Sequence, residues 1–231
     1  MPTKKSVVLH SGGMDSSICL ALAIQEFGKE NVLSLNISYG QRHSNELQAA
    51  REIAEQWGVD RFQIEIPFMK EITNDALLNH SMPIEHPLDA PPNTLVLGRN
   101  GLMAHIAGIH AGSLGASHLF MGVMEIESEN SGYRDCSRSY MDLKEAALRI
   151  DLDNPSFKIR TPLISMTKLE TLQLADELGV LPFLLEKSIT CYNSQPYWGC
   201  QTCPSCLLRN QAIRDFQSKS STFELPESYR L

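Results

Sequence analysis

Four cysteines near the C-terminal end are the residues whose type and spacing point most directly to chemistry. Cys191, Cys200, Cys203 and Cys206 follow the pattern C-x8-C-x2-C-x2-C. Four thiolates at this spacing can close a tetrahedral shell around one zinc ion, which leaves no coordination position for a substrate. They could also hold an iron–sulfur cluster or be unligated thiols, and the spacing leaves these alternatives open. We interpret the cluster as a structural zinc site with one Zn²⁺ per chain.

A second group of residues, close to the N-terminus, has the composition of a phosphate-binding loop. It reads Ser11-Gly12-Gly13-Met14-Asp15-Ser16-Ser17. Its glycines permit a close ligand approach that a β-carbon would block. The amide hydrogens and the positive end of the following helix form an anion site, to which the serine hydroxyls can add donors. The loop lacks the lysine of a Walker A motif. A Gly-Gly turn at the end of a strand is the plainer alternative.

The elements that position these residues follow from hydrophobic patterning. Strands are expected near 7–9, 32–37, 62–66 and 119–123, and helices near 16–27, 45–57, 102–111, 141–150 and 168–178. This alternation predicts an α/β fold with a doubly wound parallel sheet. We expect a nucleotide-binding domain over 1–186 and a zinc-binding region over 187–231 that packs on it.

The connections between these elements are expected to be irregular. The proline-rich stretch 79–93 is predicted to be a loop over the active face, and 125–136 a polar loop. A helix is expected to begin near Leu207, and the polar tail after about Phe216 is expected to be poorly anchored.

Composition narrows the class of protein. The 231 residues carry a net charge of −7, which argues against nucleic acid as the main partner because phosphate contacts need a basic face. No apolar run approaches the ~20 residues that span a bilayer, and none resembles an export signal. Without an export signal, a dense cysteine cluster favours metal binding over disulfides. The cytoplasm is the expected compartment, with no membrane partner.

The phosphate-loop motif resembles a known superfamily. Ser11 to Ser16 read SGGMDS, which is similar to the SGGxDS signature of the PP-loop, or N-type ATP pyrophosphatase, superfamily. The resemblance implies a Rossmann-like sheet of the adenine nucleotide alpha hydrolase type. It also implies ATP cleavage between the α and β phosphates, with Mg²⁺, to adenylate a carboxylate or carbonyl oxygen.

A narrower resemblance extends over about residues 6–210. The motifs that carry it, besides SGGMDS and the cysteine block, are Tyr39-Gly40-Gln41-Arg42-His43, Gly98-Arg99-Asn100, Ser131-Gly132-Tyr133, Asp135-Cys136 and Thr161-Pro162-Leu163. Together they resemble the 7-cyano-7-deazaguanine synthase family of queuosine precursor biosynthesis. Leu97 and Arg134 stand where that family's pattern has proline, which puts the shape of the substrate-side loop in doubt.

The resemblance implies a ligase that converts 7-carboxy-7-deazaguanine and ammonia to the nitrile, and it suggests a homodimer. The implied catalytic residues are Asp15, Ser16 and Lys168. The implied ATP-binding residues are His10, Ser11, Gly12, Gly13, Met14, Asp15, Ser16 and Ser17. The implied substrate-binding residues are Tyr39, Gln41, Arg42, His43, Arg99, Asn100, Tyr133 and Asp135.

Plainer roles remain open for three of these residues. Asn100 could cap the helix that follows it, and His43 could lie on the surface. Lys168 could be a solvated side chain at a helix start, although the helix dipole disfavours a cation there and so favours an anionic partner. Two other functions also remain open. One is another PP-loop enzyme, such as a tRNA-modifying thiolase or an ammonia-dependent amidating enzyme, and the other is a zinc-ribbon nucleic-acid-binding module.

Overall fold

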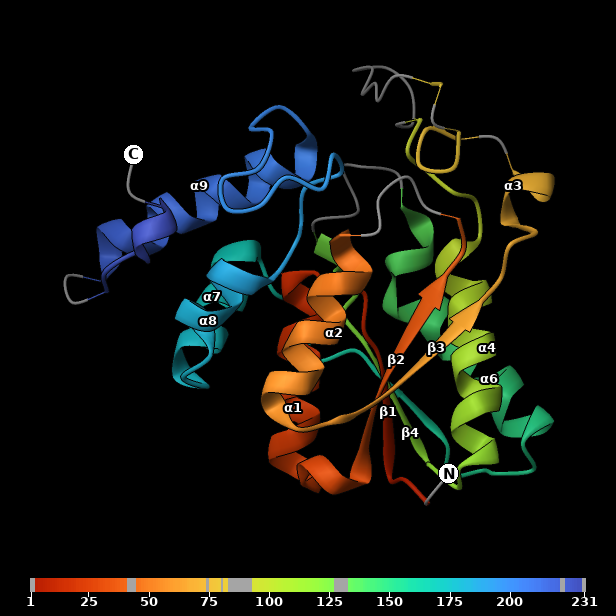
Figure 1. The fold of residues 1–231 in the computed structure, drawn as a ribbon. Coiled ribbons are helices and arrows are strands. Elements are labelled where there is room, and N and C mark those ends of the chain that lie inside the picture. Colours follow the sequence, from red (N-terminus) through yellow and green to blue (C-terminus); the bar gives the residue numbers. More distant parts are fainter. Residues whose placement is uncertain are drawn as a thin grey trace.

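A five-stranded parallel sheet forms the centre of the computed structural model, which describes residues 3–40, 45–73, 75–79, 81–82, 93–126, 133–220 and 223–229. The strand order is β3-β2-β1-β4-β5 (Figure 1). The strands are β1 Ser6–Leu9, β2 Val32–Ser38, β3 Asp60–Glu65, β4 His118–Met121 and β5 Lys158–Arg160. The order reverses at β1, whose last residue, Leu9, pairs with Leu35 of β2 and Met121 of β4.

Helices cover both faces of this sheet. They are α1 Met14–Phe27, α2 Asn45–Trp57, α3 Met69–Ile72, α4 Arg99–Ser113, α6 Arg138–Asp151, α7 Lys168–Glu177, α8 Leu181–Lys187 and α9 Pro204–Lys219. Short 3-10 turns lie at Lys29–Asn31, Arg134–Cys136 and Glu227–Tyr229. In Figure 1, α1 and α2 lie on one face of the sheet and α4 and α6 on the other.

Alternate strand residues enter two separate hydrophobic cores, as the two-residue repeat of a strand requires. Val8 and Phe120 pack in the core on the α1 side. Their neighbours Val7 and Leu119 pack in the core on the α4 side. Because both faces of the central strands are buried, the doubly wound parallel sheet expected from the sequence is confirmed.

The C-terminal helices extend the α1-side core. Leu172 of α7, Leu184 of α8 and Ile213 of α9 belong to the same buried cluster as Ile18 of α1. Figure 1 shows these helices as a separate layer beside α1, with α9 outermost.

The expectation of a poorly anchored tail is wrong for residues 223–229. Tyr229 is 3% exposed, and its hydroxyl donates to the Leu185 carbonyl at 3.0 Å. The Trp198 indole donates to the Tyr229 carbonyl at 2.9 Å. One buried tyrosine, hydrogen-bonded through its hydroxyl and its backbone carbonyl, therefore holds a polar segment that looks unattached in sequence.

Among the described helices and strands, three were not expected from the sequence, namely α3, with four residues, β5, with three, and α8, with seven. All three are too short for a clear hydrophobic repeat. The proline-rich loop lies mostly outside the described residues, as does most of the loop after Glu125.

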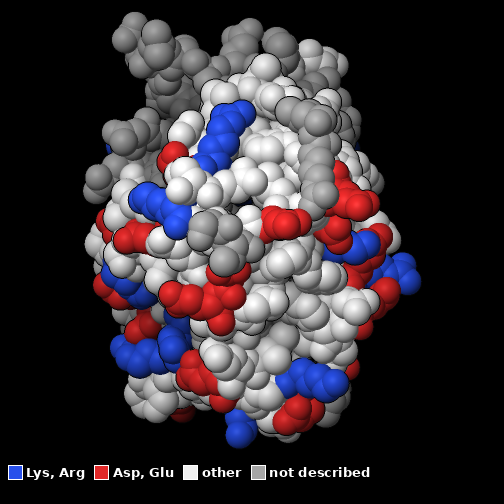
Figure 2. All heavy atoms as spheres, turned by 90° about the vertical axis from the view of Figure 1, so that its left-hand side faces the viewer, with Lys and Arg blue, Asp and Glu red and all other residues white. Residues whose placement is uncertain are grey.

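The described surface mixes charges. On the face of Figure 2, acidic and basic side chains are interspersed, with uncharged residues between them. Within the described residues, no helix is both long enough and apolar enough to cross a bilayer.

Candidate active site

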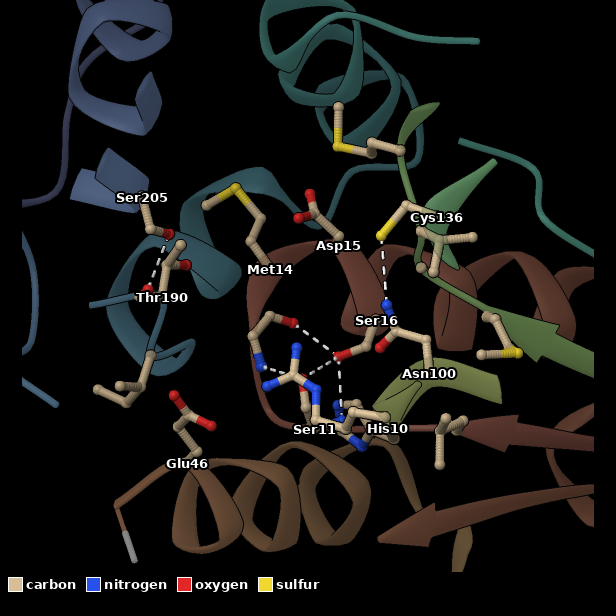
Figure 3. Close-up of a pocket in the computed structure, with 18 of the residues that line it drawn as sticks. His10, Ser11, Met14, Asp15, Ser16, Glu46, Asn100, Cys136, Thr190 and Ser205 are labelled. Carbon is tan, nitrogen blue, oxygen red and sulfur yellow. Dashed lines mark hydrogen bonds between the residues drawn. The ribbon is translucent and has the colours of Figure 1, made fainter. Parts of the chain in front are cut away.

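A cavity of about 430 Å³ opens where the carboxyl ends of β1 and β4 meet. This is the point at which the strand order reverses, and open α/β sheets bind their ligands there. The cavity wall combines the β1–α1 turn with the starts of α2, α4 and α7 and with residues of the cysteine region (Figure 3).

The turn from β1 into α1 forms the floor of this cavity. Gly13 is the N-cap of α1. The Ser16 hydroxyl donates to the Gly13 carbonyl at 3.0 Å and accepts from the Ser11 amide at 3.2 Å. The Ser11 and Ser16 hydroxyls are 3.1 Å apart. These bonds order the loop at the positive end of α1, where an anion is favoured.

Two glycines allow neighbouring elements to approach this turn. Gly12 has φ +88°, and a Cβ there would lie 2.7 Å from the Ala50 amide nitrogen of α2. Gly122, which follows β4, would place a Cβ 2.7 Å from the Ser16 amide nitrogen. Gly12 therefore serves the packing of α2 and does not line the cavity. Gly122 does line it and was not anticipated.

Asp15 and Lys168 form an ion pair at the cavity. The Lys168 Nζ lies 2.6 and 2.7 Å from the two Asp15 carboxylate oxygens. Lys168 is 5% exposed, so it is not a solvated side chain. It begins α7, which Thr167 and Glu170 cap reciprocally. The unfavourable cation at this helix start thus has an anionic partner, and that partner is Asp15.

His10 and Ser17 support the loop from below. The His10 ring nitrogens lie 2.9 Å from the Ser34 hydroxyl and 3.0 Å from the Ser17 hydroxyl. Burial lowers the pKa of His10 to about 3, so its ring is neutral. The Ser17 hydroxyl also donates to the Gly13 carbonyl at 2.8 Å. Ser17 is buried and does not line the cavity, whereas Met14 does.

Residues from β2 and α4 form the far wall. Arg99 Nη1 donates to the Tyr39 hydroxyl at 3.3 Å, and its guanidinium lies 6.0 Å from that ring's centre. The Tyr133 hydroxyl lies 2.9 Å from the Thr94 hydroxyl. The structure therefore brings Tyr39, Arg99 and Tyr133 to the cavity. Gln41, Arg42 and His43 lie outside the described residues.

Asn100 and Asp135 have separate positions. The Asn100 side chain lines the cavity and donates to the Cys136 sulfur at 3.2 Å. The Asp135 carboxylate accepts from the Asn100 backbone amide at 3.1 Å, so Asp135 caps the start of α4. Asp135 is buried and does not line the cavity.

Glu46 is a cavity residue that sequence reasoning missed. It lies in the first turn of α2, and Figure 3 shows its side chain beside the cavity. Burial raises its pKa to about 7, although the positive charge of Arg99 opposes this rise. An acidic residue in a first helical turn is an ordinary helix-start signal, so nothing in the sequence marked it as functional.

The segment after α8 contributes another missed part of the wall. Thr190, Tyr192 and Ser205 all line the cavity. The Ser205 hydroxyl donates to the Thr190 carbonyl at 2.9 Å. The Ile189 amide donates to the Gly12 carbonyl at 3.0 Å, which joins the segment to the phosphate loop. These contacts place the cysteine region directly beside the cavity.

The four cysteines are arranged as a metal site. Their sulfur atoms all lie within 4.8 Å of one another. In a tetrahedral zinc site with Zn–S bonds of ~2.3 Å, neighbouring sulfur atoms are about 3.8 Å apart. The four sulfurs therefore need to move only slightly toward one another to bind zinc. The amides of Cys200 and Cys203 each donate to a cysteine sulfur at 3.3 Å, which favours thiolates. The donor set therefore fits a thiolate-bound metal.

The sheet order, the turn after β1 and the cavity at the point of reversal define a PP-loop α/β protein. The chain belongs to the family described as queuosine biosynthesis protein QueC, whose model matches residues 5–217. Membership implies an ATP-dependent enzyme with a role in queuosine biosynthesis.

Two solved structures are similar to this chain over most of its length. The NMN synthetase from Francisella tularensis is 15% identical with a TM-score of 0.49, and the match covers 98% of this chain and 90% of that one. The U34-tRNA thiolase NcsA from Methanococcus maripaludis, solved with its [4Fe-4S] cluster, is 17% identical with a TM-score of 0.49. That match covers 97% of this chain and 75% of the thiolase.

Proposed function

We propose that this protein joins ammonia to 7-carboxy-7-deazaguanine at the expense of ATP and forms 7-cyano-7-deazaguanine. The carboxylate oxygen attacks the α-phosphorus, pyrophosphate leaves, and an acyl-adenylate forms. Ammonia displaces AMP from it to give the amide. A second ATP adenylates the amide oxygen, and loss of AMP with the remaining N–H protons gives the nitrile. The observation that carries the proposal is the phosphate loop with its Asp15–Lys168 pair in a chain of this family.

The phosphate end of the cavity supports the adenylation step. In the proposal, the backbone donors at the start of α1 bind the triphosphate, with the Ser11 and Ser16 hydroxyls lining the same loop. Lys168 supplies a positive charge for the leaving pyrophosphate, and Asp15 holds that ammonium in position. These residues raise the rate by orienting the nucleotide and balancing developing charge, without a covalent intermediate on the protein.

The opposite wall suits a planar, anionic substrate. Tyr39 and Tyr133 offer aromatic surface and hydroxyl groups, and Arg99 offers a guanidinium for a carboxylate. The mixed charges on the face in Figure 2 are consistent with a small-molecule substrate rather than nucleic acid, which would favour a basic surface.

Two metals have different roles in the proposal. Mg²⁺ would neutralise phosphate charge when it binds with ATP, and Asp15 is a cavity carboxylate that could contribute to holding it. Zn²⁺ would be held by the four cysteines and would stabilise the cavity wall that follows Ile189.

The test is direct assay of the purified protein. With the deazaguanine acid, ammonium, ATP and Mg²⁺, mass spectrometry should detect the nitrile together with two AMP for each product formed. Asp15→Asn should lose this turnover, because Lys168 would be left without its charge partner. Glu26→Asn, which removes an exposed carboxylate paired with Arg160, is the matched control and should stay active. Failure of the wild-type protein to form amide or nitrile would refute the proposal.

Metal analysis tests the cysteine site separately. We expect about one zinc per chain, because four thiolates complete one tetrahedral shell. Cys200→Ser should lower the zinc content. Stoichiometric iron with visible absorption would instead establish an iron–sulfur cluster.

A further inference from the structure

The proposed reaction must remove protons from nitrogen inside the cavity. Ammonia that attacks the acyl-adenylate acquires a positive charge and must lose a proton to give the neutral amide. In the second half, one N–H proton must leave when the amide is adenylated to the imidate, and the other must leave as the C–O bond to AMP breaks and the C≡N bond forms. A group that accepts protons near neutral pH is therefore needed in both halves.

Most titratable groups among the described cavity residues are unsuited to this task. Both oxygens of Asp15 are held by the Lys168 ammonium. His10 is buried, both its ring nitrogens are within hydrogen-bond distance of serine hydroxyls, and its pKa is about 3. Burial raises the pKa of Tyr39 and that of Tyr192, so neither phenol readily becomes an anion.

Glu46 differs from these groups in geometry. It lines the cavity from the first turn of α2, next to the phosphate loop (Figure 3). The Glu46 backbone carbonyl lies so close to Gly12 that a Cβ on Gly12 would clash with it. The phosphate loop therefore packs directly against the start of α2. Among the described residues, none forms a hydrogen bond or ion pair with its carboxylate. Its side chain lies at the cavity, within reach of a ligand bound there.

We propose, on the basis of the function proposed above, that Glu46 is the base that accepts protons from the reacting nitrogen. In the first half, the C–N bond forms, one N–H proton passes to the Glu46 carboxylate, and the C–O bond breaks with its electron pair going to AMP. In the second half, the amide gives one N–H proton to Glu46 as its oxygen is adenylated. After Glu46 has released that proton to water, the imidate R–C(=NH)–O–AMP gives its remaining N–H proton to the same carboxylate. The nitrogen electrons complete the triple bond, and AMP leaves.

The surrounding charges fit this role. Among the described residues, Arg99 of α4 is the cation that faces Glu46, and Tyr39, which follows β2, is a further titratable neighbour. Asp15 and Lys168 lie at the α1–α7 side of the same cavity and neutralise one another. Burial raises the pKa of Glu46 to about 7, which suits a group that must both accept and release protons at neutral pH.

The amide gives the sharper experiment, because its conversion to the nitrile needs no added ammonia. Nitrile formation from the amide and ATP should rise with pH through about 7 in the wild-type protein and then level off. Glu46→Gln should be slower by about 100-fold and should lack this pH dependence. ATP–pyrophosphate exchange with the acid, measured without ammonia, should stay close to the wild-type rate, which also shows that the variant is folded.

Two further variants separate a base from a binding group. Glu46→Asp should keep the pH dependence at a reduced rate. Glu55→Gln, on the same helix with an exposed side chain paired with Arg51, should behave as the wild type. Retention of the rate and pH dependence in Glu46→Gln, or a defect confined to a higher KM, would overturn the inference while the proposed function stood. A wild-type protein that forms neither amide nor nitrile would remove both.

Discussion

Burial disfavours the charged forms of two titratable side chains at the cavity, and the two make stability depend on pH in opposite directions. The pKa of His10 is lowered from 6.5 to about 3 in the folded protein. As pH falls below 6.5, His10 therefore becomes protonated in the unfolded chain while it stays neutral in the folded protein. The pKa of Glu46 is raised to about 7, so the folded protein keeps a proton that the unfolded chain has lost. The first effect lowers stability in acid, and the second lowers it at and above neutral pH.

A prediction about Glu46 follows at this scale. Because its pKa rises from 4.5 to about 7 on folding, stability is lost progressively as pH rises between these values. Glu46→Gln should therefore raise the free energy of unfolding by about 1–3 kcal/mol at pH 8 and leave it nearly unchanged at pH 4. Urea denaturation at the two pH values measures this difference. The exposed control Glu55→Gln should show no such gain at pH 8, and an equal gain in both variants would contradict the assigned burial effect.

At the scale of elements, α2 is positioned by a glycine rather than by a side chain. Gly12 carries φ +88°, and its missing Cβ leaves room for the backbone of α2 at Glu46 and Ala50. This close approach places the first turn of α2 at the cavity, so the phosphate loop and Glu46 are fixed by one contact.

Gly12→Ala should consequently lower the free energy of unfolding more than the same substitution at a glycine that has a similar φ but free space around it. Gly179 has φ +69° and nothing within 4 Å of a built Cβ, so Gly179→Ala should cost only backbone strain of about 1–2 kcal/mol. Gly12→Ala adds overpacking against α2, for a further ~1–3 kcal/mol. Thermal or urea unfolding of the two variants measures the difference. Equal destabilisation would show that α2 moves aside without cost.

Sequence patterns predict the helices and strands that have long hydrophobic repeats. They do not predict short elements or cavity residues whose positions depend on tertiary contacts. Residues 45–57 were expected as a helix and form α2 with those bounds. In contrast, β5 has a single fully buried side chain, Ile159, which gives no repeat to detect. The phosphate loop could be recognised from its motif, but Thr190 reaches the cavity only because residues after α8 fold back onto Gly12. Sequence spacing carries no sign of such a contact.

At the scale of the whole molecule, the cysteine cluster joins the cavity to the C-terminal helix. Thr190 lines the cavity immediately before Cys191, and Ser205 lines it immediately before Cys206. Behind the cluster, Arg209 is 1% exposed and donates to the Tyr197 carbonyl and to Asn210. These hydrogen bonds tie the start of α9 to the segment between Cys191 and Cys200.

If the four cysteines hold zinc as proposed, removing it should disturb the cavity wall as well as the cysteine region. Four clustered thiolates without a cation repel one another, and the free energy of metal binding is lost from folding. After treatment with a zinc chelator, we expect a lower melting temperature and faster proteolysis within residues 189–208, both reversed by added Zn²⁺. Cys200→Ser, which removes the partly exposed ligand, should reproduce the change without chelator. A metal-free protein with an unchanged melting temperature and unchanged protease resistance would contradict this prediction. The structure of the cavity wall would then depend on the packing of α9 against α7 rather than on the metal.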